Sequence, residues 1–245
     1  VTGVDDTIDD GNQDTTVTIA VVDASSDDAY DPLSNQTVTV TTTDDDTVGY
    51  TLSGTTVTVA ETGTTATFTV VLDTQPSTDV VLTVTSADTG EATVSPSTLT
   101  FTNGNWDSTQ TVTVTGIDDV ILDGPQDTTV TIAVDDGSSD NTYDDVADQT
   151  VTVTTSDDDS PGISIAQTEG STVVGENGSI DTFDAVLTTQ PLSDVVVSIS
   201  SADTGEATVS PSTLTFTDGN WDTTRTVIVT GVDDTIDDGN QDTTV

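Results

Sequence analysis

The sequence has no cysteine, histidine, lysine or methionine, and Arg225 is its single basic side chain. Without cysteine there is no disulfide framework, thiolate metal site or cysteine nucleophile. Without histidine and lysine there is no histidine-dependent triad, Schiff base or imidazole zinc site. No apolar run approaches the roughly 20 residues that a membrane-spanning helix needs. These absences exclude most nucleophilic, redox and transition-metal chemistry.

Negative charge dominates what is present: 45 aspartates and glutamates give 245 residues a formal charge of −44. A surface this acidic repels phosphate backbones and anionic lipid headgroups. We therefore expect no nucleic-acid partner and no membrane insertion in this segment.

High acidity is also typical of disordered chains, but here 31% of the residues are hydrophobic and they follow a pattern. Residues 64–72 read TTATFTVVL and residues 128–134 read TTVTIAV, with apolar residues alternating with threonine. A period of two with β-branched residues on both phases is typical of strands with one buried and one wet face. The chain is predicted to be ordered and all-β.

Seven strands are predicted in the middle of the chain, separated by Gly, Pro, Asn and Asp turns. They span Thr56–Ala60, Thr64–Leu72, Val80–Ser86, Ala92–Phe101 with a bend at Pro96, Gln110–Thr115, Thr128–Val134 and Gln149–Thr155. Seven short strands in about 110 residues fit an immunoglobulin-like antiparallel sandwich.

The sequence repeats itself. TGVDDTIDDGNQDTTV begins at Thr2 and at Thr230, and a close variant begins at Thr115. A period of about 114 residues indicates tandem domains in a head-to-tail array and is too long for a solenoid coil. We expect 1–46 to be the C-terminal part of one repeat, 47–159 a complete repeat and 160–245 the N-terminal part of a third. The identical ends predict a window on a longer array; the alternative is that 1–46 of one chain completes 160–245 of the next by strand donation.

Carboxylates gather where alternate strands of the complete repeat end. If the strands run up and down, the first, third, fifth and seventh strands all end at one pole. The acidic residues that follow these strand ends are Glu61, Asp88, Asp118, Asp119, Asp123, Asp157, Asp158 and Asp159. About eight like charges within about 10 Å repel by several kcal/mol, and the chain has almost no basic residue to offset them. Hard oxygen ligands in such numbers favour Ca²⁺, with Mg²⁺ second because it demands a stricter octahedron.

The same segments resemble the Calx-β repeat. VAETGTTATFTVVL, SADTGEA, LTFTNGNW, VTGIDDVILDG and a closing TTSDDD follow in that family's order across the complete repeat. The resemblance implies a seven-stranded Ca²⁺-binding sandwich of the kind found in ion exchangers and giant bacterial surface proteins. Two positions depart from the family: Asp123 replaces a glutamate, and Gln126 replaces an acidic residue.

The resemblance also implies a ligand set for each repeat. In the complete repeat the implied ligands are Glu61, Asp88, Asp118, Asp119, the Ile121 carbonyl, Asp123, Asp157, Asp158 and Asp159. In the following repeat they are Glu176, Asp203, Asp233, Asp234 and Asp238, and in the preceding one Asp5, Asp6, Asp10, Asp44, Asp45 and Asp46. The acidic loop Asp135–Gln149 lies at the opposite pole by the same parity. It can either help ions to bridge consecutive repeats or simply be solvated.

The function expected from these patterns is structural and not enzymatic. Ca²⁺ would stiffen a repeat segment of an extracellular fibre, a surface layer or an adhesin stalk. The expected partners are the neighbouring repeats and, if filaments form, identical chains. The alternative is a carbohydrate- or surface-binding module that uses the threonine ladders. A glycosidase-like carboxylate pair is disfavoured because the same acids recur in each repeat, and halophilic acidity without specific sites predicts an even spread of charge. Asn35 and Asn177 begin sequons, which permit glycans.

Overall fold

The protein is all-β throughout the residues that its computed structural model describes, 1–236 and 239–245. Three single-turn 3-10 helices interrupt the strands, at Asp23–Ser25, Asn141–Tyr143 and Thr168–Gly170. No helix in this described part is long and apolar enough to cross a membrane. The predicted fold class is therefore confirmed at the level of an all-β chain.

The chain divides into two compact units. The first comprises Val1–Val57, Thr65–Thr115 and Thr128–Val153, and the second comprises Thr58–Thr64, Gly116–Asp127 and Thr154–Val245. The acidic strand ends of the middle repeat thus belong to the second unit. The repeat boundaries 46/47 and 159/160 stay a prediction.

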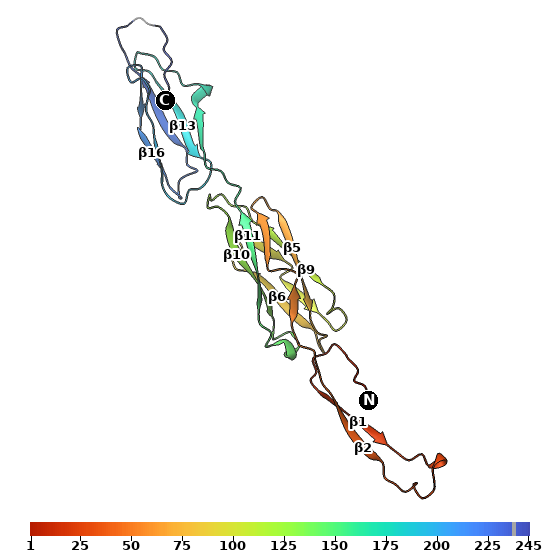
Figure 1. Cartoon of the computed structure of the whole chain (residues 1–245). Coiled ribbons are helices and arrows are strands. Elements are labelled where there is room, and N and C mark those ends of the chain that lie inside the picture. Colours follow the sequence, from red (N-terminus) through yellow and green to blue (C-terminus); the bar gives the residue numbers. More distant parts are fainter. Residues whose placement is uncertain (237–238) are drawn as a thin grey trace. The chain divides into compact units, whose positions relative to one another are not determined.

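The middle repeat contains two sheets that build a β-sandwich (Figure 1). One has the order β4-β11-β10-β6-β8 and the other β3-β5-β9-β7. The bounds of the first sheet are β4 Thr56–Ala60, β11 Gln149–Ser156, β10 Gln126–Val134, β6 Val80–Ser86 and β8 Thr98–Phe101. Those of the second are β3 Tyr50–Leu52, β5 Thr65–Leu72, β9 Gln110–Gly116 and β7 Ala92–Ser95.

The core between these sheets consists of the apolar residues at alternate positions of the strands. On β5, Phe68, Val70 and Leu72 are buried, while Thr69 and Val71 between them are half-buried. On β10, Val130 and Ile132 are fully buried in the same way. Apolar burial at alternate positions is the main stabilising contribution here, at about 1.5–3 kcal/mol for each large side chain.

Two features of the strand prediction were wrong. The predicted single strand Ala92–Phe101 is two strands, β7 and β8, in different sheets. Pro96 lies between them and cannot donate to a ladder, so the chain leaves one sheet there and enters the other. The short strand β3 was missed. Tyr50 begins it, lies buried and donates its hydroxyl to Ile132 O at 2.6 Å.

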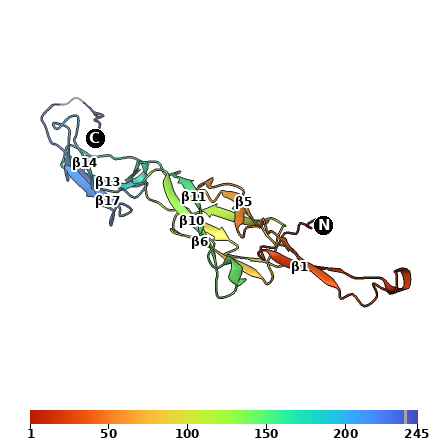
Figure 2. The same ribbon diagram turned by 60° about the horizontal axis from the view of Figure 1, so that its bottom comes forward.

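Similar elements occur on both sides of the middle repeat. β1 (Gln13–Ile19) and β2 (Gln36–Thr42) pair as a hairpin, in red in Figure 2. The C-terminal part has a sheet of order β12-β13-β17-β15 and a pair β14-β16. Their bounds are β12 Ile163–Gln167, β13 Ile180–Leu187, β17 Arg225–Gly231, β15 Ala207–Ser210, β14 Val195–Ser198 and β16 Thr213–Phe216.

The order β12-β13-β17-β15 matches β3-β5-β9-β7 element by element, as the sequence repeat requires. The core of this C-terminal part is formed by Ala185, Leu187, Leu214, Phe216 and Val227. Trp221 packs against this core. The single basic side chain, Arg225, begins β17 and pairs in register with Ala185.

Candidate metal centre

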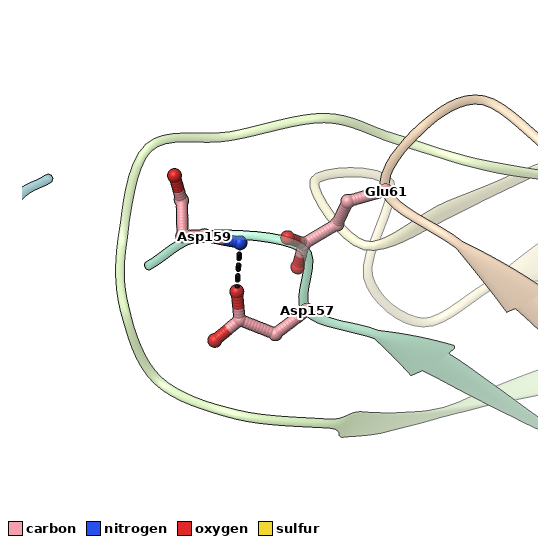
Figure 3. A group of neighbouring side chains, drawn as sticks. All are labelled: Glu61, Asp157 and Asp159. Atoms are coloured by element: carbon pink, nitrogen blue, oxygen red, sulfur yellow. Dashed lines mark hydrogen bonds between the residues drawn. The ribbon is translucent and has the colours of Figure 1, made fainter. Parts of the chain in front are cut away.

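Two strand ends bring three carboxylates together within the second unit. β4 ends at Ala60 and β11 ends at Ser156, and the next residue on the first strand, Glu61, donates its backbone N–H to Ser156 O at 3.1 Å. Asp157 and Asp159 follow β11 directly. Figure 3 shows Glu61 reaching the group from one segment of chain and the two aspartates from the other.

One carboxylate oxygen from each of Glu61, Asp157 and Asp159 lies within 4.8 Å of the others. Across residues 1–236 and 239–245, no other three acidic side chains meet this closely. Glu61 is only 1% exposed, and the two aspartates are half-buried. Burying a charge is expensive unless it is paired or coordinates a metal, and these three charges have the same sign.

Asp157 shapes the segment around the group. Its Oδ1 accepts a hydrogen bond from Asp159 N and its Oδ2 one from Gly124 N, both at 2.7 Å. Gly124 has φ = 75°, a left-handed conformation that glycine adopts without the Cβ penalty of other residues. The loop between β9 and β10, which we call the acidic loop (residues 117–125), is thereby attached to the end of β11.

The electrostatics of the group favour a cation. Burial, followed by repulsion from Asp157, Asp158, Asp119 and Asp118, raises the pKa of Asp159 above its ordinary value. Its Oδ2, and Oδ1 of Asp123 in the acidic loop, are buried oxygens that accept no hydrogen bond within the described chain. Hard, anionic oxygens with free lone pairs are the ligands that Ca²⁺ prefers, so this donor set fits that ion.

Gly116 positions Glu61 and was not singled out from the sequence. It ends β9 beside the end of β4, and a Cβ built on it would overlap the carbonyl oxygen of Ala60, the residue before Glu61. Gly231 has the same relation to Gly175, which precedes Glu176. The glycine in each VTG(I/V)DD segment was the signal available in the sequence.

The other ligands implied for the middle repeat lie in several environments. Asp119 Oδ1 accepts a hydrogen bond from Ile121 N at 2.6 Å, which closes a local turn. Asp88 is exposed and accepts one from Gly90 N at 2.8 Å. Asp118 and Asp158 are exposed, and Asp123 is half-buried. Their role as ligands, with that of the Ile121 carbonyl, stays a prediction.

The preceding repeat has the same local design within the first unit. Asp44 accepts hydrogen bonds from Asp46 N at 2.9 Å and Gly11 N at 2.6 Å, and these bonds lower its pKa. Burial and then repulsion from Asp44, Asp45, Asp5 and Asp6 raise the pKa of Asp46. Asp6 accepts from Ile8 N at 3.0 Å, and Asp5, Asp10 and Asp45 are exposed. The arrangement is therefore a property of the repeat.

The ligands implied for the third repeat are more open. Glu176, Asp203 and Asp233 are exposed. Asp203 accepts from Gly205 N at 2.8 Å, and Asp234 from Ile236 N at 2.7 Å. Asp238 lies outside the described residues.

A different acidic segment, Asp135–Gln149, was predicted to lie at the other pole. It is attached to its own repeat through Asp140. This carboxylate is 5% exposed and accepts hydrogen bonds from Ser77 N and Oγ, Thr78 N, and Thr142 N and Oγ1, at 2.7 to 3.1 Å. Burial opposes its ionisation, but these bonds outweigh burial and hold its pKa well below the ordinary value. Asp140 is thus a structural anion, satisfied without a metal ion.

No family model and no curated protein sequence matches the chain. Solved structures with some similarity include domains 4 and 5 of the S-layer protein SbsC, at 26% identity and a TM-score of 0.37, covering 59% of this chain and 58% of that one. Calcium binding domain CBD12 of CALX1.1 is 17% identical, with a TM-score of 0.33 and 76% of each chain covered. SSP-19, an MSP-domain protein of Caenorhabditis elegans, is 18% identical, with a TM-score of 0.30 and 44% and 97% covered. Similarity this low carries no argument about function.

Proposed function

We propose that this chain is a structural segment of an extracellular fibre, surface layer or adhesin stalk, built from tandem seven-stranded, immunoglobulin-like sandwiches of the Calx-β kind. Ca²⁺ held at the acidic end of each repeat stiffens the segment. The observation that supports this most is the meeting of Glu61, Asp157 and Asp159, with Glu61 1% exposed, in a chain whose one basic side chain lies on β17.

In this proposal the three carboxylates hold the ion, and Asp119 and Asp123 complete the shell from the acidic loop, which the Gly124–Asp157 hydrogen bond attaches to the group. The bound ion neutralises charges that otherwise repel, so the ends of β4 and β11 and the acidic loop are held as one body. Extracellular Ca²⁺ is millimolar, which suits sites with dissociation constants on the order of 10⁻⁴ to 10⁻³ M. A cell-surface location follows from that match. The partners are neighbouring repeats and, in a filament, identical chains.

Calorimetric titration of the whole chain with Ca²⁺ tests the site. The substitution Glu61→Gln keeps the shape of the side chain but removes one of three anionic ligands. We expect it to weaken binding at that repeat about tenfold or more, since affinity follows ligand charge. Binding at the Asp44–Asp46 site of the preceding repeat serves as an internal reference.

The matched control is Asp107→Asn, which removes one negative charge from an exposed turn. It should leave the titration almost unchanged. Equal weakening by both substitutions would mean that Ca²⁺ responds only to net charge, and absence of any saturable binding would refute the proposed function.

A further inference from the structure

The acidic loop makes a second kind of contact, through its backbone, inside the second unit. Val120 O accepts a hydrogen bond from Gln190 N at 2.7 Å, and Leu122 N donates to Gln190 O at 3.2 Å. These two bonds form an isolated parallel bridge between Ile121 and Gln190. Gln190 belongs to the turn between β13 and β14, in the repeat that follows the loop.

The first unit contains the first of these two bonds one repeat earlier. Gln75, in the turn between β5 and β6, donates its N–H to Thr7 O at 2.7 Å. Thr7 and Val120 occupy the same place in their repeats, as TGVDDT and TGIDDV show, and both glutamines stand in a Thr-Gln-Pro sequence. The bond from the glutamine N–H to the loop carbonyl is therefore present at two places with different neighbours.

Local interactions leave the backbone groups of both segments available for this pairing. Asp119 takes the N–H of Ile121, so Val120 O and Leu122 N, on the opposite side of the extended segment, are left to bond outward. On the other side, the proline after each glutamine disfavours helical conformation and holds the glutamine extended. Two extended segments with free backbone groups associate as strands do, which requires no particular side chain at Thr7 or Val120.

We propose that residues 120–122, and their counterparts 7–9, are a docking strand that receives the Thr-Gln-Pro turn of the next repeat. The partner is another copy of the same kind of repeat, recognised by backbone hydrogen bonds. This inference goes beyond the proposed Ca²⁺ site because the pairing uses neither a carboxylate nor an ion. It gives successive repeats a fixed register whether or not metal is bound.

Amide hydrogen exchange of the unaltered chain tests the pairing directly. The N–H groups of Gln75, Gln190 and Leu122 should each exchange about tenfold more slowly than those of unpaired turn residues, the protection expected of one ordinary hydrogen bond. The protection of Gln75 and Gln190 should persist in EDTA. Free exchange at both glutamines would overturn the docking strand, whereas loss of protection only in EDTA would make it dependent on the proposed ion site.

The substitution Gln190→Pro removes the donor N–H, and Gln190→Ala is the matched control that keeps it. Because the chain lacks cysteine, spin labels can be placed at Thr62→Cys and Thr213→Cys, two exposed positions of the second unit that belong to successive repeats. We expect a narrow label-to-label distance distribution in the parent and in Gln190→Ala, and one at least twofold broader in Gln190→Pro. Fluorescence of Trp221, which packs on the core of that repeat, verifies folding. Equal widths in all three proteins would refute the proposal.

Discussion

Asp140 illustrates how an acidic chain uses a single carboxylate without a cation. Its two oxygens accept five hydrogen bonds: three from Ser77 and Thr78 join the loop after β10 to the turn before β6, and two from Thr142 lie within the loop. Hydrogen bonds to a charged acceptor contribute more than neutral ones, about 1.5–3 kcal/mol each when broken singly. The negative charge is therefore part of the fold at this residue, unlike the exposed carboxylates around it.

We expect Asp140→Asn to lower the free energy of unfolding by about 2 kcal/mol at neutral pH, because a neutral amide accepts these bonds less strongly and one oxygen becomes a donor. Urea denaturation of the whole chain measures this. Asp136→Asn, in the same loop but exposed, is the control and should change the stability by less than about 0.5 kcal/mol.

The same residue predicts a pH dependence. The pKa of Asp140 is lowered on folding, so its contribution to stability is complete above the unfolded value near 3.8 and is lost as the pH falls toward the folded pKa. We expect the difference in stability between the parent and Asp140→Asn to shrink between about pH 5 and pH 2. A difference that stays constant over this range would show that the carboxylate acts only through its shape.

At the scale of elements, the ends of β4 and β9 approach so closely that Gly116 has no room for a side chain. We expect Gly116→Ala to force these ends apart and to destabilise the fold by about 1–3 kcal/mol. Because Glu61 follows the displaced Ala60, Ca²⁺ binding should weaken as well. Gly104→Ala, where a Cβ meets nothing closer than 3.8 Å, is the control. Thermal unfolding with and without Ca²⁺ measures both effects, and a variant as stable as the parent would contradict this explanation.

The strands were predictable from sequence where alternation runs for five residues or more, as on β5 and β10, because burial on one face dictates a period of two. β3 is only three residues long, and the hydroxyl of its first residue, Tyr50, donates to Ile132 O and accepts from Gln149 N, two partners far away in sequence. The exchange of sheets at Pro96 likewise depends on which strands are free to pair. No local pattern carries such information.

The candidate site was predictable in part for the same reason. Strand parity places Glu61 and the aspartates after β11 at one pole, and the structure brings Glu61, Asp157 and Asp159 together. Parity does not say that Asp119 and Asp88 accept hydrogen bonds from their own loops, nor that Gly124 attaches the acidic loop to Asp157. These details depend on loop conformation, which hydrophobic alternation does not determine.

At the scale of the whole molecule, a formal charge of −44 with one basic side chain makes self-repulsion a general term in stability. Any salt reduces that term, since the screening length falls to about 10 Å at about 0.1 M ionic strength. A rise in melting temperature on adding CaCl₂ is therefore not enough to indicate a specific site. The comparison has to be made where monovalent screening has already reached its plateau.

In about 0.3 M NaCl, where the screening length is below about 8 Å, we expect a few millimolar CaCl₂ to raise the melting temperature further by mass action on the folded state. MgCl₂ at the same concentration should raise it less, because Mg²⁺ gives up its waters reluctantly and demands a stricter octahedron. Glu61→Gln should lose part of the Ca²⁺ increment and keep the whole NaCl increment. Equal increments from Ca²⁺ and Mg²⁺, unaffected by this substitution, would instead indicate a halophilic surface whose acids act through net charge alone.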